Sequence, residues 1–365
     1  MQSGKSMTAS ASVGESPIKC IVWDLDETLW RGTLLEGGAD ALAPGVEAVM
    51  RALDDRGILQ SIASKNDHDV AWGQIEALGI ADFFLFPQIG WWSKASAIEK
   101  IADQLGIGLE AIALVDDQPA ERDEVAYLLP QVSLFDPAQL SALLDEPRLI
   151  PRFITSETRH RRSMYRADIE RADAGDRFAG PRDAFLATLT MQMHIRRASA
   201  DDLERAEELT IRTNQLNTTG RHYSYDELAA LIESPDHLVL VAQLDDRYGS
   251  SGTIGLALVD LGPDNWTVRL LIMSCRVVSR GVGTVFLLHL LQRAQASGVR
   301  LRASYVPTAR NKPMLVTFRL AGFRQIAEDE DGQLLEHDFA RMPGLPAYVK
   351  VTSDAFDDAR APVPR

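Results

Sequence analysis

The chain has 365 residues, of which 45% are hydrophobic and 25% charged, and its 38 Lys and Arg against 52 Asp and Glu give a formal net charge of −14. This length is sufficient for two domains, and the ordinary balance of apolar and charged residues excludes a wholly disordered or low-complexity chain. The negative charge repels phosphate backbones and anionic lipids, which disfavours nucleic acid as a partner.

The two cysteines, Cys20 and Cys275, lie far apart and form no Cys-x-x-Cys pair. This pattern disfavours a disulfide scaffold or a zinc site and fits a reducing compartment, so we expect a cytoplasmic protein. No stretch approaches the roughly 18 to 20 uncharged apolar residues that a membrane-spanning helix needs, so we expect no membrane association. Residues 1–17 lack the apolar region of a signal peptide, and we expect them to be disordered.

From residue 18 to 146, short apolar runs alternate with amphipathic stretches, which is typical of a parallel sheet covered by helices. The βαβαβ order predicts an α/β domain over this range. The expected strands are 18–23, 58–64, 83–86 and 111–116, and the expected helices are 46–57, 69–79 and 96–106.

Residues 147–190 are more basic and polar, and we expect a helical linker there. A second α/β domain is predicted over 191–340, and 341–365 is expected to be a C-terminal tail. In the second domain the expected strands are 191–198, 238–244, 253–261, 267–275, 299–306, 323–328 and 332–339, and the expected helices are 201–216, 225–234, 284–298 and 311–322.

Two carboxylates, Asp24 and Asp26, directly follow the first expected strand. In extended backbone, side chains two residues apart project to one side, here at the carboxyl edge of the sheet where α/β folds place ligands. Like charges held this close repel each other unless a cation neutralises them, and Mg²⁺ with its oxygen ligands fits that role. A solvated turn is the alternative for an isolated pair of this kind.

The segment Asp24-Leu25-Asp26-Glu27-Thr28 resembles the haloacid dehalogenase (HAD) superfamily, whose mark is DxDx[TV] after the first strand. Three further motifs of that superfamily appear in order. Ser64 ends the second expected strand, Lys94 precedes a helix, and Asp116-Asp117 follow the last strand of this domain. Lys94 alone has the alternative of being a solvated lysine at a helix start.

The resemblance implies phosphatase chemistry with Mg²⁺ as cofactor. Asp24 would attack phosphorus to give an aspartyl phosphate, and Asp26 would protonate the leaving oxygen and later deprotonate the attacking water. Ser64 and Lys94 would bind and neutralise the phosphoryl oxygens. A backbone carbonyl would join the metal ligands, whose candidate side chains are Asp24, Asp26, Asp116 and Asp117.

The two segments in which this superfamily carries cap domains are short in this chain. Residues 31–57 hold a flap and one helix, and 65–93 hold one helix and one strand, so we expect no cap. An uncapped site suits a phosphate carried on a bulky partner better than a small metabolite that needs enclosure.

The order of elements over 191–340 resembles the GCN5-related N-acetyltransferase (GNAT) fold, which binds pantetheine phosphates at a [QR]xxGx[GA] turn. Arg280, Gly281 and Gly283 fit that turn, but Val285 stands where Gly or Ala is expected. A branched side chain narrows the backbone nest that would receive pyrophosphate, which disfavours ordinary acetyl-CoA binding. A plain helix-starting turn is the alternative.

Together the two halves, over 18–340, are similar to the FkbH-like family, which joins a HAD phosphatase domain of subfamily IIIC to a GNAT-like domain. The motifs that carry this similarity are WDLDETLW, RSMYRADIER, RTNQLNTTGRHYS, LDDRYGSSGTIG and MSCRVVSRGVG. The sequence departs from the family pattern at Glu27, Arg31 and Gly283. These departures concern substrate positioning more than the reaction.

The resemblance implies a glyceryl transferase and phosphatase of polyketide biosynthesis. In that family 1,3-bisphosphoglycerate donates a phosphoglyceryl group, the phosphate is removed, and a glyceryl thioester is left on the phosphopantetheine arm of a holo-acyl carrier protein (ACP). Two alternatives remain open: a stand-alone Mg²⁺ phosphatase of a small phosphometabolite with a non-catalytic GNAT-like binding domain, and a non-enzymatic scaffold that docks a carrier.

Cys275 is the thiol that the resemblance offers for a covalent stage, at the level where GNAT strands part to admit an acyl chain. Arg276 and Arg280 follow closely enough to favour a thiolate or bind phosphate. An inert buried cysteine is the alternative, and Cys20 is assigned to the core. The candidate bases for the thiol are His222, His289 and His337, of which His289 lies on an apolar helix.

Asn214 and Asn217 share a helix face if the helix predicted over 201–216 persists that far. They would then orient a glyceryl hydroxyl or a thioester carbonyl. The alternative is that they only satisfy the backbone of the turn before Thr218-Thr219-Gly220.

Overall fold

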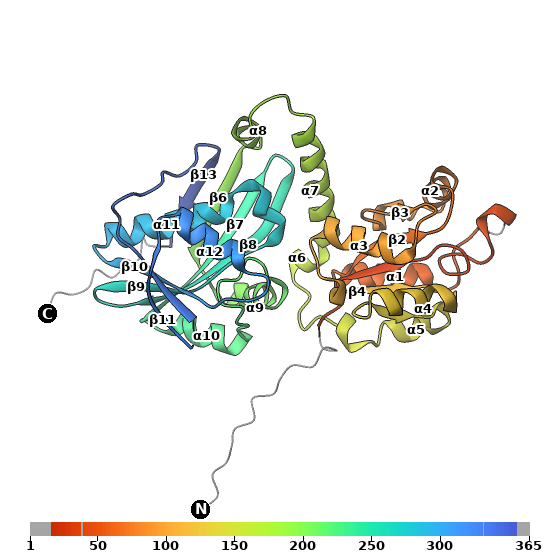
Figure 1. Cartoon of the computed structure of the whole chain (residues 1–365), viewed down its shortest axis with the longest axis horizontal. Helices are drawn as coiled ribbons and strands as arrows, with labels where there is room; N and C mark the ends of the chain where they lie inside the picture. Colours follow the sequence, from red (N-terminus) through yellow and green to blue (C-terminus); the bar gives the residue numbers. More distant parts are fainter. Residues whose placement is uncertain (1–15, 38, 331, 356–365) are drawn as a thin grey trace, which may run out of the picture. The chain divides into compact units, whose positions relative to one another are not determined.

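The computed structural model describes residues 16–37, 39–330 and 332–355 (Figure 1). The chain divides into two compact units, Met1–Ser163 and Met164–Arg365, and the division falls inside the segment 147–190 that was expected to be a linker. The disorder expected for 1–17 concerns mainly residues 1–15, which lie outside the described residues. The predicted fold class, α/β with a parallel sheet followed by a second sheet, is confirmed.

The first unit is built on a parallel sheet with the strand order β3-β2-β1-β4-β5. Its strands are β1 (Cys20–Trp23), β2 (Leu59–Ser64), β3 (Gln88–Ile89), β4 (Ile112–Val115) and β5 (Ser133–Phe135). Trp23 is opposite Ile62 of β2 and Val115 of β4, so the carboxyl ends of three neighbouring strands meet at one edge. Residues that follow these strands are therefore brought together.

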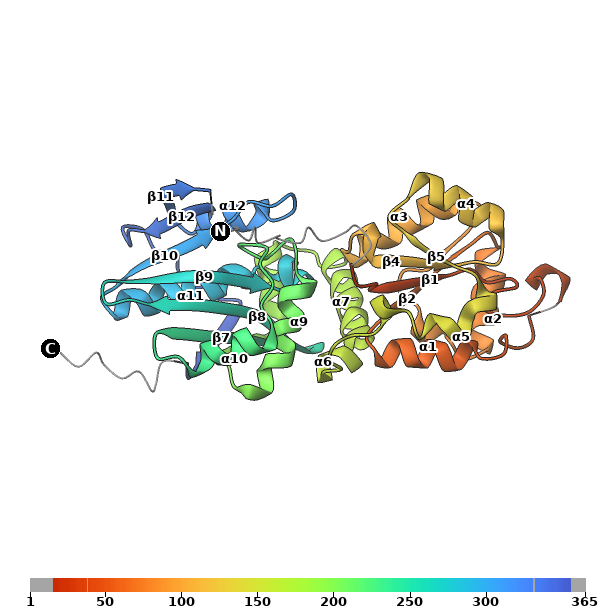
Figure 2. The ribbon, with the colours of Figure 1, turned by 90° about the horizontal axis from the view of Figure 1, so that it is seen from below.

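Helices cover both faces of this sheet, with α3 and α4 on one face and α1 and α5 on the other (Figure 2). The α-helices of this unit are α1 (Val46–Asp55), α2 (His68–Ala77), α3 (Lys94–Leu105), α4 (Pro119–Leu128), α5 (Leu140–Leu143) and α6 (Ser156–Arg159). Helix α1 buries Val46, Val49, Met50 and Leu53, a spacing that places one apolar stripe on the sheet. The unit also contains five described 3₁₀ turns: η1 (Leu34–Glu36), η2 (Ala81–Phe83), η3 (Leu109–Ala111), η4 (Pro137–Gln139) and η5 (Pro147–Leu149).

The prediction of a strand at 83–86 is wrong. Phe83 ends the turn η2, Phe84 forms only an isolated bridge with Gln60, and the third strand is β3 at Gln88–Ile89. Both phenylalanines are buried in the core, so their apolar character reflects packing and not strand pairing. Among the described residues, the segment between β1 and β2 holds η1 and α1, and the segment between β2 and β3 holds α2 and η2, so neither contains a further domain.

The second unit has a mixed eight-stranded sheet with the order β11-β12-β10-β9-β8-β7-β6-β13. Neighbours are antiparallel except β9 with β10 and β6 with β13, which are parallel. The strands are β6 (Met191–Arg197), β7 (His237–Asp246), β8 (Gly249–Leu261), β9 (Asn265–Met273), β10 (Arg300–Tyr305), β11 (Arg324–Asp329), β12 (Gly332–His337) and β13 (Val349–Ser353).

The helices of the second unit connect these strands, and α7 (Arg161–Asp176) runs across the division between the units. The others are α8 (Arg182–Thr188), α9 (Leu203–Arg212), α10 (Tyr225–Glu233), α11 (Val282–Ala296) and α12 (Lys312–Leu320), with 3₁₀ segments η6 (Ala200–Asp202) and η7 (Cys275–Arg280). None of the described helices is long and apolar enough to cross a bilayer.

The segment 341–365, expected to be a tail, contains strand β13. Val349 to Ser353 pair in parallel with Met191 to Ile195 of β6, and Val349 is buried. The sequence of this strand, VKVTS, is too short to stand out locally, and only the free edge of β6 supplies its partner.

Candidate active site

Asp24, Lys94 and Asp116 form a buried ionic cluster at the carboxyl edge of the parallel sheet. Asp24 follows β1 and Asp116 follows β4, and Lys94 is the first residue of α3. Lys94 Nζ lies 2.6 Å from Asp24 Oδ1 and 2.8 Å from Asp116 Oδ2. The exposed fractions of the three residues are 4%, 3% and 0%, so water screens these charges weakly.

The cluster has two carboxylates and one ammonium group, so these three groups together leave one negative charge in excess. Burial raises the pKa of Asp24 to about 6, although Lys94 acts in the opposite direction. Burial and the neighbouring Asp116 also raise the pKa of Asp117 above its ordinary value. A cation at this position would favour the ionised form of all three carboxylates.

The residues present fit a hard divalent cation. Asp24, Asp116 and Asp117 each offer a carboxylate oxygen, and these oxygens all lie within 4.8 Å of one another. Asp117 Oδ1 is buried, and no hydrogen-bond donor of the described residues reaches it. Converging carboxylate oxygens are the ligands that Mg²⁺ takes in proteins.

Asp26 does not belong to that group of carboxylates, which corrects the expectation that it is a metal ligand. Its Oδ1 accepts hydrogen bonds from Trp30 Nε1 at 2.8 Å and from the Leu34 amide at 3.0 Å. Its Oδ2 accepts one from Asn66 Nδ2 at 3.0 Å. The chain leaves the extended conformation here, and Glu27 has φ 51°, so the alternation that would place Asp26 beside Asp24 does not continue.

Ser64 lies at the end of β2 and is buried, and Asn66 Nδ2 is 3.4 Å from its Oγ. Asn66 therefore joins Ser64 to Asp26. Sequence analysis missed Asn66; the only signal was a polar residue two positions beyond a strand that ends in a motif serine. Its contacts connect the candidate phosphate-binding Ser64 to the candidate acid Asp26, and it is not a member of the ionic cluster.

In the second unit, Cys275 is the first residue of η7 and is half-buried. The strand expected to end at Cys275 ends at Met273. Of the three candidate bases, His222 is exposed, and burial lowers the pKa of His289 to about 4, which keeps it neutral near pH 7. His337 is buried, with Nε2 3.0 Å from the Ala321 carbonyl and Nδ1 accepting from the Phe339 amide.

Asn214 and Asn217 do not share a helix face, because α9 ends at Arg212. Asn214 is exposed. Asn217 is fully buried, and its Oδ1 accepts hydrogen bonds from the amides of Thr219 and Gly220 at 3.1 and 2.8 Å. The structure therefore gives Asn217 the alternative role, which is to satisfy the backbone of the turn.

The chain's own segment 216–218 occupies the edge of β9 beyond the point where β9 and β10 stop pairing. The last pair between these strands is Val268 with Ala303. Beyond it, the Met273 amide donates to the Leu216 carbonyl at 3.0 Å, and the Thr218 amide donates to the Leu271 carbonyl at 3.1 Å. This edge, where an acyl chain was expected to enter, is therefore already hydrogen-bonded.

Asn311, which sequence analysis also missed, holds this segment in place. It is fully buried, and its Nδ2 donates to the carbonyls of Asn217 and Val306 at 3.0 and 2.9 Å. Its Oδ1 accepts from the Thr308 amide at 2.8 Å and from Tyr305 Oη at 3.1 Å. One side chain thus joins the segment 216–218 to the end of β10.

We expect Asn311→Ala to lower the free energy of unfolding by about 2 to 4 kcal/mol, because several buried partners lose their hydrogen bonds together. The measurement is equilibrium urea unfolding. The control is Lys312→Ala at the adjacent exposed position, for which we expect a change within about 0.5 kcal/mol. Equal stability of the two variants would contradict the structural role of Asn311.

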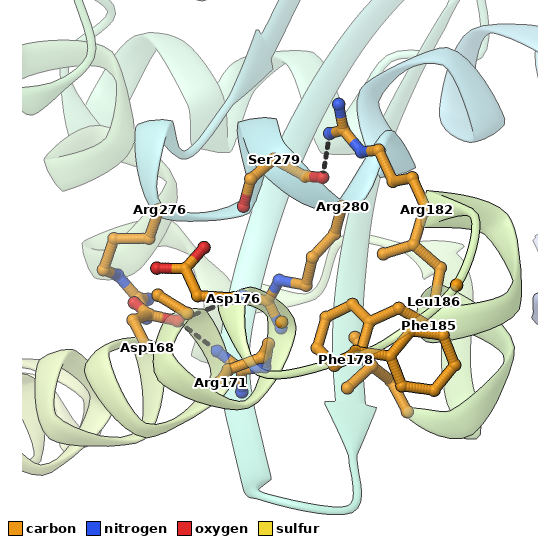
Figure 3. A pocket seen from close by; sticks show the side chains of 14 residues that line it. Asp168, Arg171, Asp176, Phe178, Arg182, Phe185, Leu186, Arg276, Ser279 and Arg280 are labelled. Carbon is orange, nitrogen blue, oxygen red and sulfur yellow. Dashed lines mark hydrogen bonds and ion pairs between the residues drawn. The ribbon is translucent and has the colours of Figure 1, made fainter.

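The arginines of the turn before α11 pair with carboxylates of the same unit (Figure 3). Arg280 has an exposed fraction of 1% and lies 3.0 Å from Asp246 and 3.5 Å from Asp168. Burial lowers the pKa of Arg280 to about 10. Arg276 lies 3.7 Å from Asp168 and donates to the Ser251 carbonyl. Both arginines therefore have partners within the protein.

The two glycines of this turn differ. Gly281 has φ 70°, a conformation that favours glycine, and a Cβ there would lie 2.7 Å from Tyr348 Oη, so that side chain would have to shift. Gly283 is the second residue of α11, and a Cβ there would make an ordinary contact of 3.4 Å with Met273, so the space does not require glycine. Val285 is fully buried in the core of the unit.

Comparison with models of protein families gives no match, and comparison with curated proteins gives none either. Among solved structures, the N-terminal part of BF1531 from Bacteroides fragilis, which contains a phosphatase domain complexed with Mg, is similar over 38% of this chain, with 25% identity and a TM-score of 0.33. This match covers 42% of that chain, less than half of its length.

Acetyltransferase structures are also similar to part of this chain. The paia N-acetyltransferase from Thermoplasma acidophilum, in complex with coenzyme A, matches over 40% of this chain and 98% of its own, with 18% identity and a TM-score of 0.34. The GNAT domain of S. lividans PAT matches over 39% of this chain and 87% of its own, with 21% identity and a TM-score of 0.31.

Proposed function

We propose that the first unit is a Mg²⁺-dependent phosphatase and that the second handles an acyl group. The complete protein would take a phosphoglyceryl group from 1,3-bisphosphoglycerate, remove the phosphate and leave a glyceryl thioester on an ACP for polyketide biosynthesis. The observation that carries the phosphatase is the buried cluster of Asp24, Lys94 and Asp116 with Asp117 beside it. The acyl transfer rests on the sequence resemblance and on the half-buried thiol of Cys275.

In the phosphatase step, a carboxylate oxygen of Asp24 attacks phosphorus, and the bond from phosphorus to the ester oxygen breaks. Asp26, fixed by its three hydrogen bonds, donates a proton to the leaving oxygen and then takes one from the water that hydrolyses the aspartyl phosphate. Ser64 and Lys94 hold phosphoryl oxygens. Asp24, Asp116 and Asp117 would hold Mg²⁺, which when bound would stabilise the phosphoryl charge.

In the acyl-transfer step, the Cys275 thiolate attacks the carbonyl carbon of the acyl phosphate. A carbon–sulfur bond forms, the bond from that carbon to the phosphate oxygen breaks, and inorganic phosphate leaves. The pantetheine thiol of ACP then attacks the same carbon and releases Cys275. Acyl transfer precedes dephosphorylation in this proposal, because a phosphatase that hydrolysed free 1,3-bisphosphoglycerate would destroy the acyl phosphate needed to make the thioester.

A protein-borne substrate is supported by the surroundings of the first site. Trp91 and Trp92, which precede Lys94 by three and two positions, are exposed by 73% and 44%. Exposed aromatic side chains are typical of surfaces that bind partners. We therefore propose that the phosphorylated group reaches Asp24 on the phosphopantetheine arm of ACP.

The test is intact mass spectrometry after incubation with 1,3-bisphosphoglycerate and Mg²⁺, with and without holo-ACP. We expect ACP to gain the mass of a glyceryl group and, in excess EDTA, that of a phosphoglyceryl group. An unmodified ACP together with phosphate release would eliminate the transferase. Equal loading of free pantetheine would eliminate the role of the carrier protein.

The second candidate function is a stand-alone phosphatase with a non-catalytic second unit. It is favoured by the occupied edge of β9, where the segment 216–218 makes the hydrogen bonds. It predicts turnover of small phosphate esters without any ACP and no adduct on Cys275.

A further inference from the structure

A cavity of about 470 Å³ lies in the second unit, lined by residues of α7, α8 and η7 and by the segment between the two helices (Figure 3). Its volume is within the range of sites that bind small organic molecules. The cavity has no role in either reaction proposed above. Its two walls differ in chemistry, one being charged and the other apolar.

The charged wall contains three buried arginines, Arg171, Arg276 and Arg280, which form ion pairs with Asp168 and Asp246. Arg171 and Arg280 both contact Asp246, at 2.8 and 3.0 Å. Asp168 contacts Arg171, and it lies 3.5 Å from Arg280 and 3.7 Å from Arg276. With Arg182 and Asp176, which also line the cavity, the four arginines and three carboxylates leave one positive charge in excess.

Burial makes that excess charge costly. The side chains of Arg171, Arg276 and Arg280 are exposed by 7%, 10% and 2%, and that of Asp246 by 0%. Arg280 Nε is buried, and none of the described residues accepts a hydrogen bond from it. A charge removed from water without full compensation is unfavourable, so an anion in the cavity would stabilise this wall.

The rim adds a further arginine. Arg182, the first residue of α8, is exposed and donates a hydrogen bond to the Ser279 carbonyl. Asp176, which also lines the cavity, is exposed as well.

The opposite wall is apolar. Phe178 and Phe185 lie with their ring centroids 5.6 Å apart, and Leu186 and Leu189 are buried beside the cavity. If an inorganic anion bound here, the apolar wall would remain in contact with water. A ligand with both an anionic group and an apolar body would satisfy both walls.

We propose that this cavity binds a small organic anion, a phosphate ester or a carboxylate, whose apolar body lies against Phe178 and Phe185 and whose charged group meets Arg171, Arg276 and Arg280. The inference goes beyond the proposed phosphatase and does not depend on it, since every residue of the cavity belongs to the second unit.

The test is isothermal titration calorimetry, which measures the dissociation constant of each probe for the full-length chain in buffer with EDTA. The probes are phenylphosphonate, benzoate, inorganic phosphate and benzyl alcohol. We expect phenylphosphonate or benzoate to bind at least about tenfold more tightly than inorganic phosphate and benzyl alcohol, because only the first two fill both walls. Tighter binding of phenylphosphonate assigns the site to phosphate esters, and tighter binding of benzoate assigns it to carboxylates.

Two pairs of matched variants locate the binding. Ala172 on α7 lines the cavity and Ala187 on α8 does not, and both are exposed. We expect Ala172→Trp to weaken binding at least about tenfold by filling the cavity, and Ala187→Trp to leave it unchanged. Likewise, Arg182→Gln should weaken binding about tenfold, because Arg182 lines the cavity. Arg177 does not line it, so Arg177→Gln should leave binding unchanged.

Thermal unfolding of each variant shows whether it is folded. Binding that is equal in Ala172→Trp and Ala187→Trp would overturn the proposal, because the probe would then occupy another site, such as the phosphatase unit. Absence of binding for both organic anions would overturn it as well. Phosphate release by the same samples is read separately, so a failure of this inference is distinguishable from a failure of the proposed phosphatase.

Discussion

Replacing Asp24 with Asn is expected to reduce Mg²⁺-dependent phosphate release by at least about 10³-fold, because an amide cannot act as the nucleophile and does not replace a carboxylate ligand. The substitution is isosteric, and Lys94 keeps Asp116 as a buried partner, so the chain should remain folded. The measurement is hydrolysis of p-nitrophenyl phosphate with Mg²⁺ and with excess EDTA, together with a thermal unfolding curve.

The matched control is Asp55→Asn on the exposed end of α1, which should retain full activity. Phosphate release that persists undiminished in folded Asp24→Asn, or in wild-type protein with excess EDTA, would show that the cluster of Asp24, Lys94 and Asp116 is not the phosphatase site.

Replacing Cys275 with Ala is expected to abolish loading of ACP, while hydrolysis of p-nitrophenyl phosphate should persist because the residues proposed for the phosphatase belong to the other unit. In the Asp24→Asn variant, where the ester phosphate is not removed, a phosphoglyceryl adduct should accumulate on Cys275 or on the pantetheine thiol. Hydroxylamine should cleave it, as it cleaves thioesters. Intact mass spectrometry measures both results.

The control here is Cys20→Ala. Cys20 lies in β1 with an exposed fraction of 0%, and burial raises the pKa of its thiol far above the ordinary value, so it should not form an adduct. Normal loading of ACP by Cys275→Ala would remove the covalent stage. Direct transfer from the acyl phosphate to the carrier thiol would then be the surviving mechanism.

The sequence by itself determined the parts of this protein that depend on local pattern. Apolar runs and amphipathic periodicity predicted most strands and helices, because the spacing of apolar residues along a short segment shows which face of the element is buried. The resemblance of short motifs to the HAD superfamily, and not their spacing alone, named Asp24, Ser64, Lys94 and Asp116 in advance. Each stands at the end of a strand or the start of a helix, and parallel strands bring such ends to one edge.

Only the tertiary structure decided which side chains contact one another across long separations in the sequence. Asp26 is held by Asn66, 40 residues away, and Asn311 holds the segment around Asn217, 94 residues away. The pairing of Arg280 with Asp246 and Asp168, and the cavity that this network lines, likewise join distant parts of one unit. A buried polar group takes whichever partner the packed chain brings within hydrogen-bond distance, and that choice leaves no periodic or local signature in the sequence.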